Sequence, residues 1–325
     1  MSTPPQSNST FVTAQDGLVL HALEFGSRAS ALKPVVCLPG FSRTAEDFTT
    51  LASALAAEGR RVLALDSRGR GRSQFDPDPA KYSLAVELAD LITLLTAAEA
   101  MPAVLVGSSR GGLLIMLLAA ARPTAIAGAI LNDIGPVIET SGLLRIKGYV
   151  GKLPLPRSLQ EGAEILRRMS VDQFPKLADA DWLSAAGRTW RQSANGLALT
   201  YDPRLAGAFA AFSPDAAPPP IWGQFDALAQ TPLMVVRGAN SDILSGATVA
   251  AMRERRPDMV VLVVPDQGHA PLLAEADSIR AIAGFAAKCD ALAASESISP
   301  KTNARTSATG SNAGIRGTEP PGRTR

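Results

Sequence analysis

The chain has 325 residues, 46% of them hydrophobic, with 32 Lys and Arg against 30 Asp and Glu. This length suits one large α/β domain with an inserted subdomain, or two small domains. The formal net charge of +2 gives no reason to expect nucleic acid or an anionic membrane as a partner, and the longest apolar stretch, residues 111–121, is well short of the roughly 20 residues that a membrane-spanning helix needs.

The N-terminus and the cysteines indicate where the protein works. Residues 1–10 are polar and lack the charged and apolar regions of a secretory signal, so we expect a disordered N-terminus and a cytoplasmic protein. Cys37 and Cys289 each lie within an apolar pattern. They are expected to be buried free thiols in a reducing compartment.

Turn signals and apolar periodicity predict alternating strands and helices in the first 136 residues. Asp16-Gly17 separates two apolar runs and predicts a hairpin within residues 11–25. Thr44 and Asp47 resemble a capping box at the start of the first helix. Further strands are expected at 34–38, 61–66, 104–106 and 126–131, with helices at 45–57, 82–98 and 111–121. This alternation predicts a mostly parallel sheet with helices on both faces, an α/β fold.

Two polar features of this half could suggest other sites. Residues 66–73 read Asp-Ser-Arg-Gly-Arg-Gly-Arg-Ser, but they lack the terminal Gly-Lys-Ser/Thr of a phosphate-binding loop. We expect a sharp loop with solvated arginines. His21 lies on the second strand of the hairpin and is expected to be structural or solvated.

The strand signal stops between residues 137 and 226. Helical patterns at 158–169, 182–190 and after Pro218 predict an all-helical lid, with some of its aromatic side chains facing a pocket. Strands at 232–237 and 259–264 and a helix at 276–293 complete the sheet domain. The tail is rich in Ser, Thr, Gly and Pro and is expected to be disordered. The predicted organisation is a disordered N-terminus 1–10, a core 11–136 and 227–294, a lid 137–226 and a disordered tail 295–325.

Residues 107–111, Gly-Ser-Ser-Arg-Gly, join a predicted strand to a predicted helix. This pattern matches the G-x-S-x-G nucleophile elbow, in which flanking glycines let the helix approach the strand closely. Ser109 would lie at the tip of the turn. A flexible glycine-serine linker is the alternative, but a linker is not expected between two apolar runs.

Ser109, Asp242 and His269 each follow a predicted strand, in the order nucleophile, acid, histidine. This order resembles the α/β-hydrolase family over residues 11–293. The elbow, Gly40-Phe41, the 66–73 loop and Gly268-His269 strengthen the resemblance. Asp133 is the alternative acid, because it also follows a strand and some relatives take the acid from there. Asp266 is a weaker third candidate, since it would have to fold back on the histidine of its own loop.

The resemblance also implies the groups that stabilise charge. It places an oxyanion hole on the backbone N–H groups of Phe41 and Arg110. The chain departs from many relatives by having Pro39 where they have histidine. Serine at the elbow separates it from relatives resembling haloalkane dehalogenases and epoxide hydrolases, which use aspartate there. No metal or cofactor is implied, since no clustered set of metal-ligating side chains is visible.

The resemblance implies a serine hydrolase that cleaves a small, fairly apolar carboxylic ester or lactone through an acyl-enzyme. Two alternatives stay open. One is a carbon–carbon bond hydrolase of ring-cleavage products, whose anionic substrates would need Arg110 or a lid arginine such as Arg145 facing the pocket. The other is a ligand receptor that keeps the triad but turns over slowly.

Overall fold

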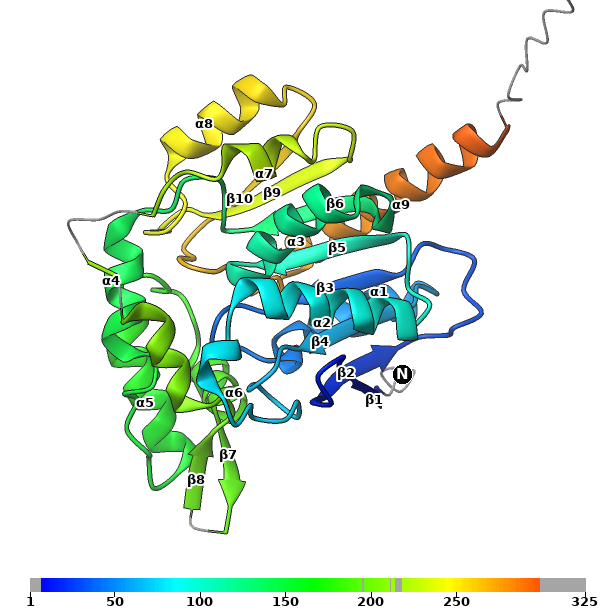
Figure 1. Cartoon of the computed structure of the whole chain (residues 1–325). Helices are drawn as coiled ribbons and strands as arrows, with labels where there is room; N and C mark the ends of the chain where they lie inside the picture. Colours follow the sequence, from blue (N-terminus) through cyan, green and yellow to red (C-terminus); the bar gives the residue numbers. More distant parts are fainter. Residues whose placement is uncertain (1–6, 195, 211, 214–217, 299–325) are drawn as a thin grey trace, which may run out of the picture.

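The computed structural model describes residues 7–194, 196–210, 212–213 and 218–298. Within these residues an eight-stranded sheet runs through the centre of the molecule, in the order β1-β2-β4-β3-β5-β6-β9-β10 (Figure 1). Its strands are β1 (Asn8–Thr13), β2 (Val19–Phe25), β3 (Val35–Leu38), β4 (Val62–Asp66), β5 (Ala103–Ser108), β6 (Ile126–Asn132), β9 (Leu233–Gly238) and β10 (Val260–Val264). The pairings of β1 with β2 and of β2 with β4 are antiparallel, and the others are parallel. The predicted, mostly parallel α/β sheet is confirmed.

Helices cover both faces of this sheet, as its alternation of strands and helices predicted. The helices of the core are α1 (Thr49–Ala57), α2 (Leu84–Ala97), α3 (Arg110–Ala121), α8 (Gly246–Arg255) and α9 (Ala276–Ile298). Short 3-10 helices lie at Ala45–Phe48, Pro79–Lys81 and Pro123–Ala125. Buried side chains of α2, α3 and α8 form one apolar cluster, and those of α1 and α9 form a second cluster on the opposite face. Because the strands from β4 to β10 pair in parallel, their carboxyl ends meet at one edge of the sheet, where open α/β sheets bind ligands.

Most of an insertion between β6 and β9 lies beside that edge, at the lower left of Figure 1, whereas its last helix, at residues 222–226, lies in the upper part of the view beside β9. Residues 137–226, here called the insert, contain α4 (Thr140–Tyr149), α5 (Leu159–Ser170), α6 (Asp179–Thr189), a 3-10 helix at Pro203–Phe209 and α7 (Trp222–Asp226). The insert also contains the hairpin β7 (Trp190–Ser193) and β8 (Gly196–Leu199). The prediction that this block is entirely helical is therefore wrong. The polar sequence of β7 gives little strand signal, and its backbone is ordered by pairing with β8.

The ends of the core differ from the predicted boundaries. β1 begins at Asn8, so residues 8–10 are ordered by pairing with β2, although their polar composition predicted disorder. Helix α9 extends to Ile298, into the predicted tail, and residues 1–6 and 299–325 lie outside the described residues. Both cysteines are free and buried, as predicted, and burial raises the pKa of the Cys289 thiol to about 11.

Candidate active site

Ser109 occupies the turn between β5 and α3, as the elbow motif predicts. Its backbone has a φ of 50°, a left-handed conformation that strains a residue other than glycine. A Cβ atom added to Gly107 would lie 2.4 Å from the carbonyl carbon of Gly111, and one added to Gly111 would lie 2.2 Å from the carbonyl oxygen of Leu38. The two glycines therefore permit a close approach of helix and strands that a larger residue would block.

His269 connects Ser109 to a carboxylate. The Nε2 atom of His269 lies 2.8 Å from Ser109 Oγ, and its Nδ1 atom lies 2.8 Å from Asp133 Oδ2. Its side chain is only 7% exposed. These three side chains come from the loops after β5, β6 and β10, which the parallel sheet brings to one edge. This geometry can pass a proton from the serine hydroxyl to the imidazole.

The Asp133 side chain is fully buried and its oxygens have several donors. Oδ1 accepts from the backbone N–H of Gly238, and Oδ2 accepts from the hydroxyl of Ser241 in addition to its contact with His269. A buried carboxylate is tolerated when its lone pairs are filled in this way. The donors also fix the direction in which Asp133 faces the imidazole.

Asp242, which motif order favoured as the acid, does not reach His269. Its carboxylate forms a bidentate ion pair with Arg145 of α4, at 2.6 and 2.8 Å. Burial alone would raise the pKa of Asp242, but the hydrogen bonds and charge of Arg145 hold this pKa below its ordinary value. The loop after β9 instead contributes Ser241 to Asp133. The expected pairing of Asp242 with His269 is thus corrected, and Asp266, the third candidate, pairs with Lys176.

Two further contacts hold the loop that carries His269. The side-chain amide of Asn132 donates to Ser108 Oγ and to the carbonyl oxygen of Pro271, at 2.8 and 2.9 Å. The backbone N–H of His269 donates to Gln173 Oε1 of the insert at 3.0 Å. Asn132 therefore links the elbow to the histidine loop, and the insert supports the same loop from the other side.

The predicted oxyanion residues lie beside Ser109. A Cβ atom added to Gly40, the residue before Phe41, would lie 3.7 Å from Ser109 Cβ. Arg110 is the first residue of α3, so its backbone N–H has no acceptor one turn earlier in the helix. Both positions suit donors directed at an oxyanion, and the N-terminus of α3 adds a favourable dipole.

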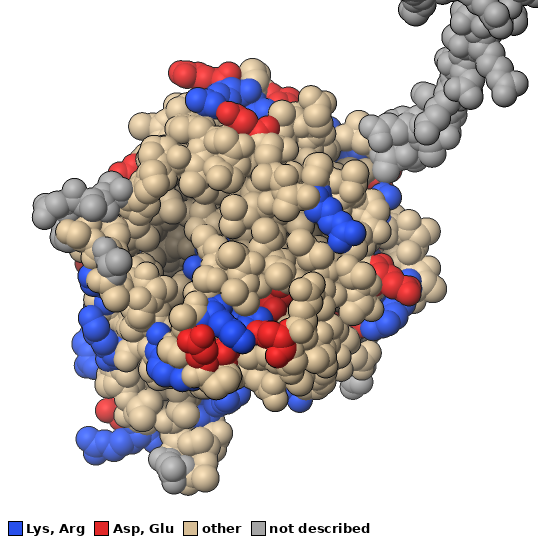
Figure 2. All heavy atoms as spheres, viewed as in Figure 1, with Lys and Arg blue, Asp and Glu red and all other residues tan. Residues whose placement is uncertain are grey.

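A cavity of about 700 Å³ adjoins Ser109 and His269. Its walls include the Gly40-Phe41 loop and apolar side chains of the insert, namely Leu153, Leu166, Met169, Phe174, Leu177 and Trp182. Figure 2 shows one face of the molecule hollowed between the insert and the sheet domain. A cavity of this size and composition suits a small ligand with an apolar part.

Comparisons with known proteins agree with this architecture. Residues 35–282 match the alpha/beta hydrolase family. The chain belongs to this family. The hydrolase is 34% identical over 280 residues to a 3-hydroxybutyrate-oligomer hydrolase of Cupriavidus necator. The aligned region covers 83% of this chain and 94% of that protein.

Two other relatives extend the comparison. The hydrolase is 27% identical over 259 residues to an sn-1-specific diacylglycerol lipase of Mus musculus, covering 74% of this chain and 76% of that protein. The crystal structure of an alpha/beta hydrolase from Novosphingobium aromaticivorans has a TM-score of 0.81 and 40% identity, covering 87% of this chain and 99% of that one.

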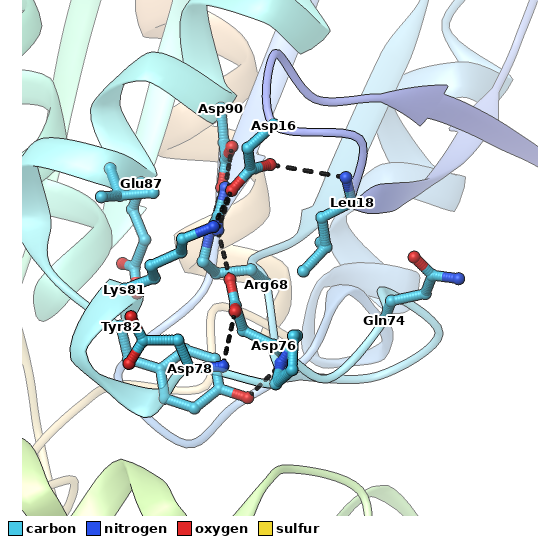
Figure 3. A network of polar contacts seen from close by, with 12 residues as sticks. Asp16, Leu18, Arg68, Gln74, Asp76, Asp78, Lys81, Tyr82, Glu87 and Asp90 are labelled. Carbon is cyan, nitrogen blue, oxygen red and sulfur yellow. Dashed lines mark hydrogen bonds and ion pairs between the residues drawn. The ribbon is translucent and has the colours of Figure 1, made fainter.

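The loop of residues 66–73 is more buried in this hydrolase than its sequence suggested. Arg68 and Arg70 are each 1% exposed, so the prediction of solvated arginines is wrong for both. Figure 3 shows Arg68 among Asp16, Asp76 and Asp90, three carboxylates from separate parts of the chain. A guanidinium group tolerates burial when carboxylates accept hydrogen bonds from it, because these contacts offset the loss of its hydration.

His21 is likewise buried, in a contact that resembles the active site in composition alone. Its Nδ1 atom lies 2.7 Å from Asp66 Oδ2 and its Nε2 atom lies 3.1 Å from Ser9 Oγ. Ser9, however, lies within strand β1 and not in a strand-to-helix turn such as that of Ser109. The prediction of a structural role for His21 fits this position.

Arg70 also connects the 66–73 loop to the predicted oxyanion loop. Its Nε atom donates to the carbonyl oxygen of Phe41 at 2.8 Å, and its Nη1 atom donates to Glu87 at 2.7 Å. Glu87 accepts from Arg110 as well, at 2.6 Å. One buried carboxylate on α2 therefore holds Arg110, a predicted oxyanion residue, and Arg70, which contacts the other one, Phe41. No sequence pattern indicates this role, since Glu87 occupies an ordinary helical position.

Replacing Glu87 by glutamine is expected to lower the free energy of unfolding by about 3–5 kcal/mol, because the change leaves two buried arginines without their counter-charge. It should also lower kcat, since the Phe41 loop loses its support. Urea unfolding and ester hydrolysis measure the two effects. Glu161→Gln, at a more exposed position on α5, is the matched control and should change stability by no more than about 0.5 kcal/mol. Equal stability of the two variants would contradict the role assigned to Glu87.

The described residues show neither a metal-binding cluster nor a membrane-spanning helix. They contain no group of three or more His, Cys, Asp or Glu side chains placed to hold a metal ion. Among them, no helix is both long and apolar enough to cross a membrane.

Proposed function

We propose that this hydrolase cleaves a small carboxylic ester or lactone through an acyl-enzyme intermediate, with Ser109 as nucleophile, His269 as general base and Asp133 as the acid. The observation that carries the proposal is the continuous hydrogen-bonded series from Ser109 through His269 to Asp133, beside a cavity lined by the insert. Serine is a weak nucleophile until a neighbouring imidazole accepts its proton.

The proposed mechanism assigns one task to each group. Ser109 Oγ attacks the ester carbonyl while His269 Nε2 takes its proton, and Asp133 fixes the imidazole tautomer and stabilises the imidazolium. The backbone N–H groups of Phe41 and Arg110 stabilise the oxyanion. The alcohol leaves with the proton from His269, and water then attacks the acyl-enzyme with His269 again as base.

The substrate class is supported by the relatives. Two of them are a 3-hydroxybutyrate-oligomer hydrolase and an sn-1-specific diacylglycerol lipase, and both an oligomer of a hydroxy acid and a diacylglycerol contain oxygen esters. The carbon–carbon bond alternative needs a cation available to an anionic substrate at Arg110 or Arg145. Arg110 is paired with Glu87, and Arg145 lines the cavity but is paired with Asp242. Neither Arg110 nor Arg145 is therefore free of a carboxylate partner, and the preference for an ester or lactone rests on the two relatives.

A substrate panel tests the proposal. The purified full chain is expected to turn over short p-nitrophenyl esters or simple lactones steadily, and to be inactive toward vinylogous ring-cleavage diketones. Ser109→Ala is the matched inactive control. Turnover of the diketones alone would favour the carbon–carbon alternative. Ligand-dependent binding of a partner with negligible turnover of any ester would favour the receptor.

A further inference from the structure

A pair of arginines in the cavity shares a single carboxylate. Asp47 follows the Gly40-Phe41 loop, and its oxygens accept from Arg43 Nε and Nη2 at 2.7 and 2.6 Å. The same carboxylate accepts from Arg188 Nε, on insert helix α6, at 2.9 Å. The sequence suggested instead that Asp47 caps a helix with Thr44, but Thr44 makes no such bond, and the N–H of Ala45 donates to Asp66.

The charges of this cluster do not cancel. Burial alone would raise the pKa of Asp47, but the charges and hydrogen bonds of Arg43 and Arg188 hold it below its ordinary value, so the carboxylate is ionised. Arginine is always charged near neutral pH. Two guanidinium groups and one carboxylate therefore leave one net positive charge in the cavity wall.

The other described charged groups of the cavity make no direct contact with the two guanidinium groups. Arg145 and Asp242 form a separate one-to-one pair. Glu46 and Asp181 also line the cavity, and the charge of Arg188 acts on the Glu46 carboxyl, but among the described residues neither forms an ion pair or hydrogen bond with Arg43 or Arg188. The side chains of Arg43 and Arg188 are 34% and 22% exposed, so each retains access to the cavity.

Donors remain on these two arginines. A guanidinium has five N–H groups. Arg43 directs two to Asp47 and one, from Nη1, to Thr189 Oγ1 at 3.2 Å. Arg188 directs one to Asp47 and one to Ser184. Among the described residues, the remaining N–H groups of Arg43 and Arg188 have no hydrogen-bond partner. Neighbouring N–H groups of a guanidinium can donate together to the two oxygens of a carboxylate.

The cluster lies close to the proposed nucleophile. The Cβ position of Gly40 is 3.4 Å from Arg43 Cγ and 3.7 Å from Ser109 Cβ, so the arginine side chain starts beside the serine. A substrate with its ester at Ser109 and a carboxylate a few bonds away could contact both. The apolar insert side chains would cover the hydrocarbon between the two groups.

We propose that Arg43 and Arg188 form a subsite for a carboxylate on the substrate, so that the preferred substrate is a short ester of a carboxylic acid that bears a second, free carboxylate. This inference rests on the proposed ester hydrolysis and adds the charge of the substrate to it. The free carboxylate belongs to either the acyl or the alcohol part of the ester, and two matched pairs of substrates distinguish these positions.

Two matched pairs of substrates test the subsite. The mono-p-nitrophenyl ester of glutarate is compared with p-nitrophenyl pentanoate for the acyl part. The butyryl ester of β-hydroxybutyrate is compared with the same ester of β-hydroxybutyramide for the alcohol part. In one of the two pairs, kcat/KM of the unaltered hydrolase should be at least about 10-fold higher for the substrate that bears the free carboxylate than for its neutral counterpart. Hydrogen bonds to charged groups contribute on this scale.

Arg43→Met and Arg188→Met should each reduce this preference by about 10-fold or more, mainly through a higher KM for the charged substrate. The neutral substrate is the reference within each variant, because it corrects for any general disturbance of the insert. Arg43→Lys should restore part of the preference, since it keeps the charge but not the planar donors. Arg167→Met removes an exposed arginine elsewhere on the insert and should keep the full preference.

The outcomes separate the two proposals. Turnover of the neutral and charged members at equal rates, or a preference that survives both methionine variants, would overturn the subsite while leaving ester hydrolysis intact. Failure of every ester to react would overturn the proposed function itself.

Discussion

Ser109→Ala is expected to lower kcat for a short p-nitrophenyl ester by about six orders of magnitude, the scale seen when the nucleophile of a serine hydrolase is removed. The variant keeps the oxyanion groups and the cavity but has no hydroxyl for His269 to activate. A fluorophosphonate probe should label the unaltered protein and leave the variant unlabelled, since the probe reacts only with an activated serine.

Ser108→Ala is the matched control for this experiment. Ser108 precedes the nucleophile and accepts a hydrogen bond from Asn132, but it lies outside the strained turn position and has no contact with His269 among the described residues. Its loss should reduce turnover by no more than about tenfold. Equal labelling of Ser109→Ala and the unaltered protein would exclude Ser109 as nucleophile, whatever its geometry.

The sequence predicted the sheet domain closely, for physical reasons. Central parallel strands are buried on both faces, so they appear as continuous apolar runs such as residues 104–106 and 126–131. Glycines flanking Ser109 mark a place where helix and strand touch, and the close approaches of Gly107 and Gly111 agree with that expectation. Sequence patterns therefore predict a feature well when residues close together in the chain determine it.

The remaining features depend on contacts between distant segments. Arg68 and Arg70 lie in a basic, glycine-rich loop whose sequence suggests solvation, and they are buried because four carboxylates from three other segments contact them. The identity of the acid is a similar case. Asp133 and Asp242 both follow a strand, but their partners differ. Ser241 donates a hydrogen bond to Asp133, whereas Arg145 of the insert pairs with Asp242. No sequence pattern near either aspartate carries that information.

Asp133→Asn is therefore expected to lower kcat by about four orders of magnitude, because the amide holds His269 in the wrong tautomer and cannot stabilise the imidazolium. Asp242→Asn should cost no more than about tenfold, through a weaker ion pair between the core and Arg145. The kcat of each variant is measured on the same ester, and circular dichroism with a thermal melt establishes that both are folded.

A double variant makes the comparison sharper. Groups that act as one unit lose activity together, so Ser109→Ala combined with Asp133→Asn should be no slower than Ser109→Ala alone. Asp133 is the residue that contacts His269 Nδ1 in the structure, and its two oxygens are fixed by Gly238 and Ser241. A large loss for Asp242→Asn with near-normal turnover for Asp133→Asn would return the acid to the loop after β9, and would require the hydrolase to rearrange both loops before catalysis.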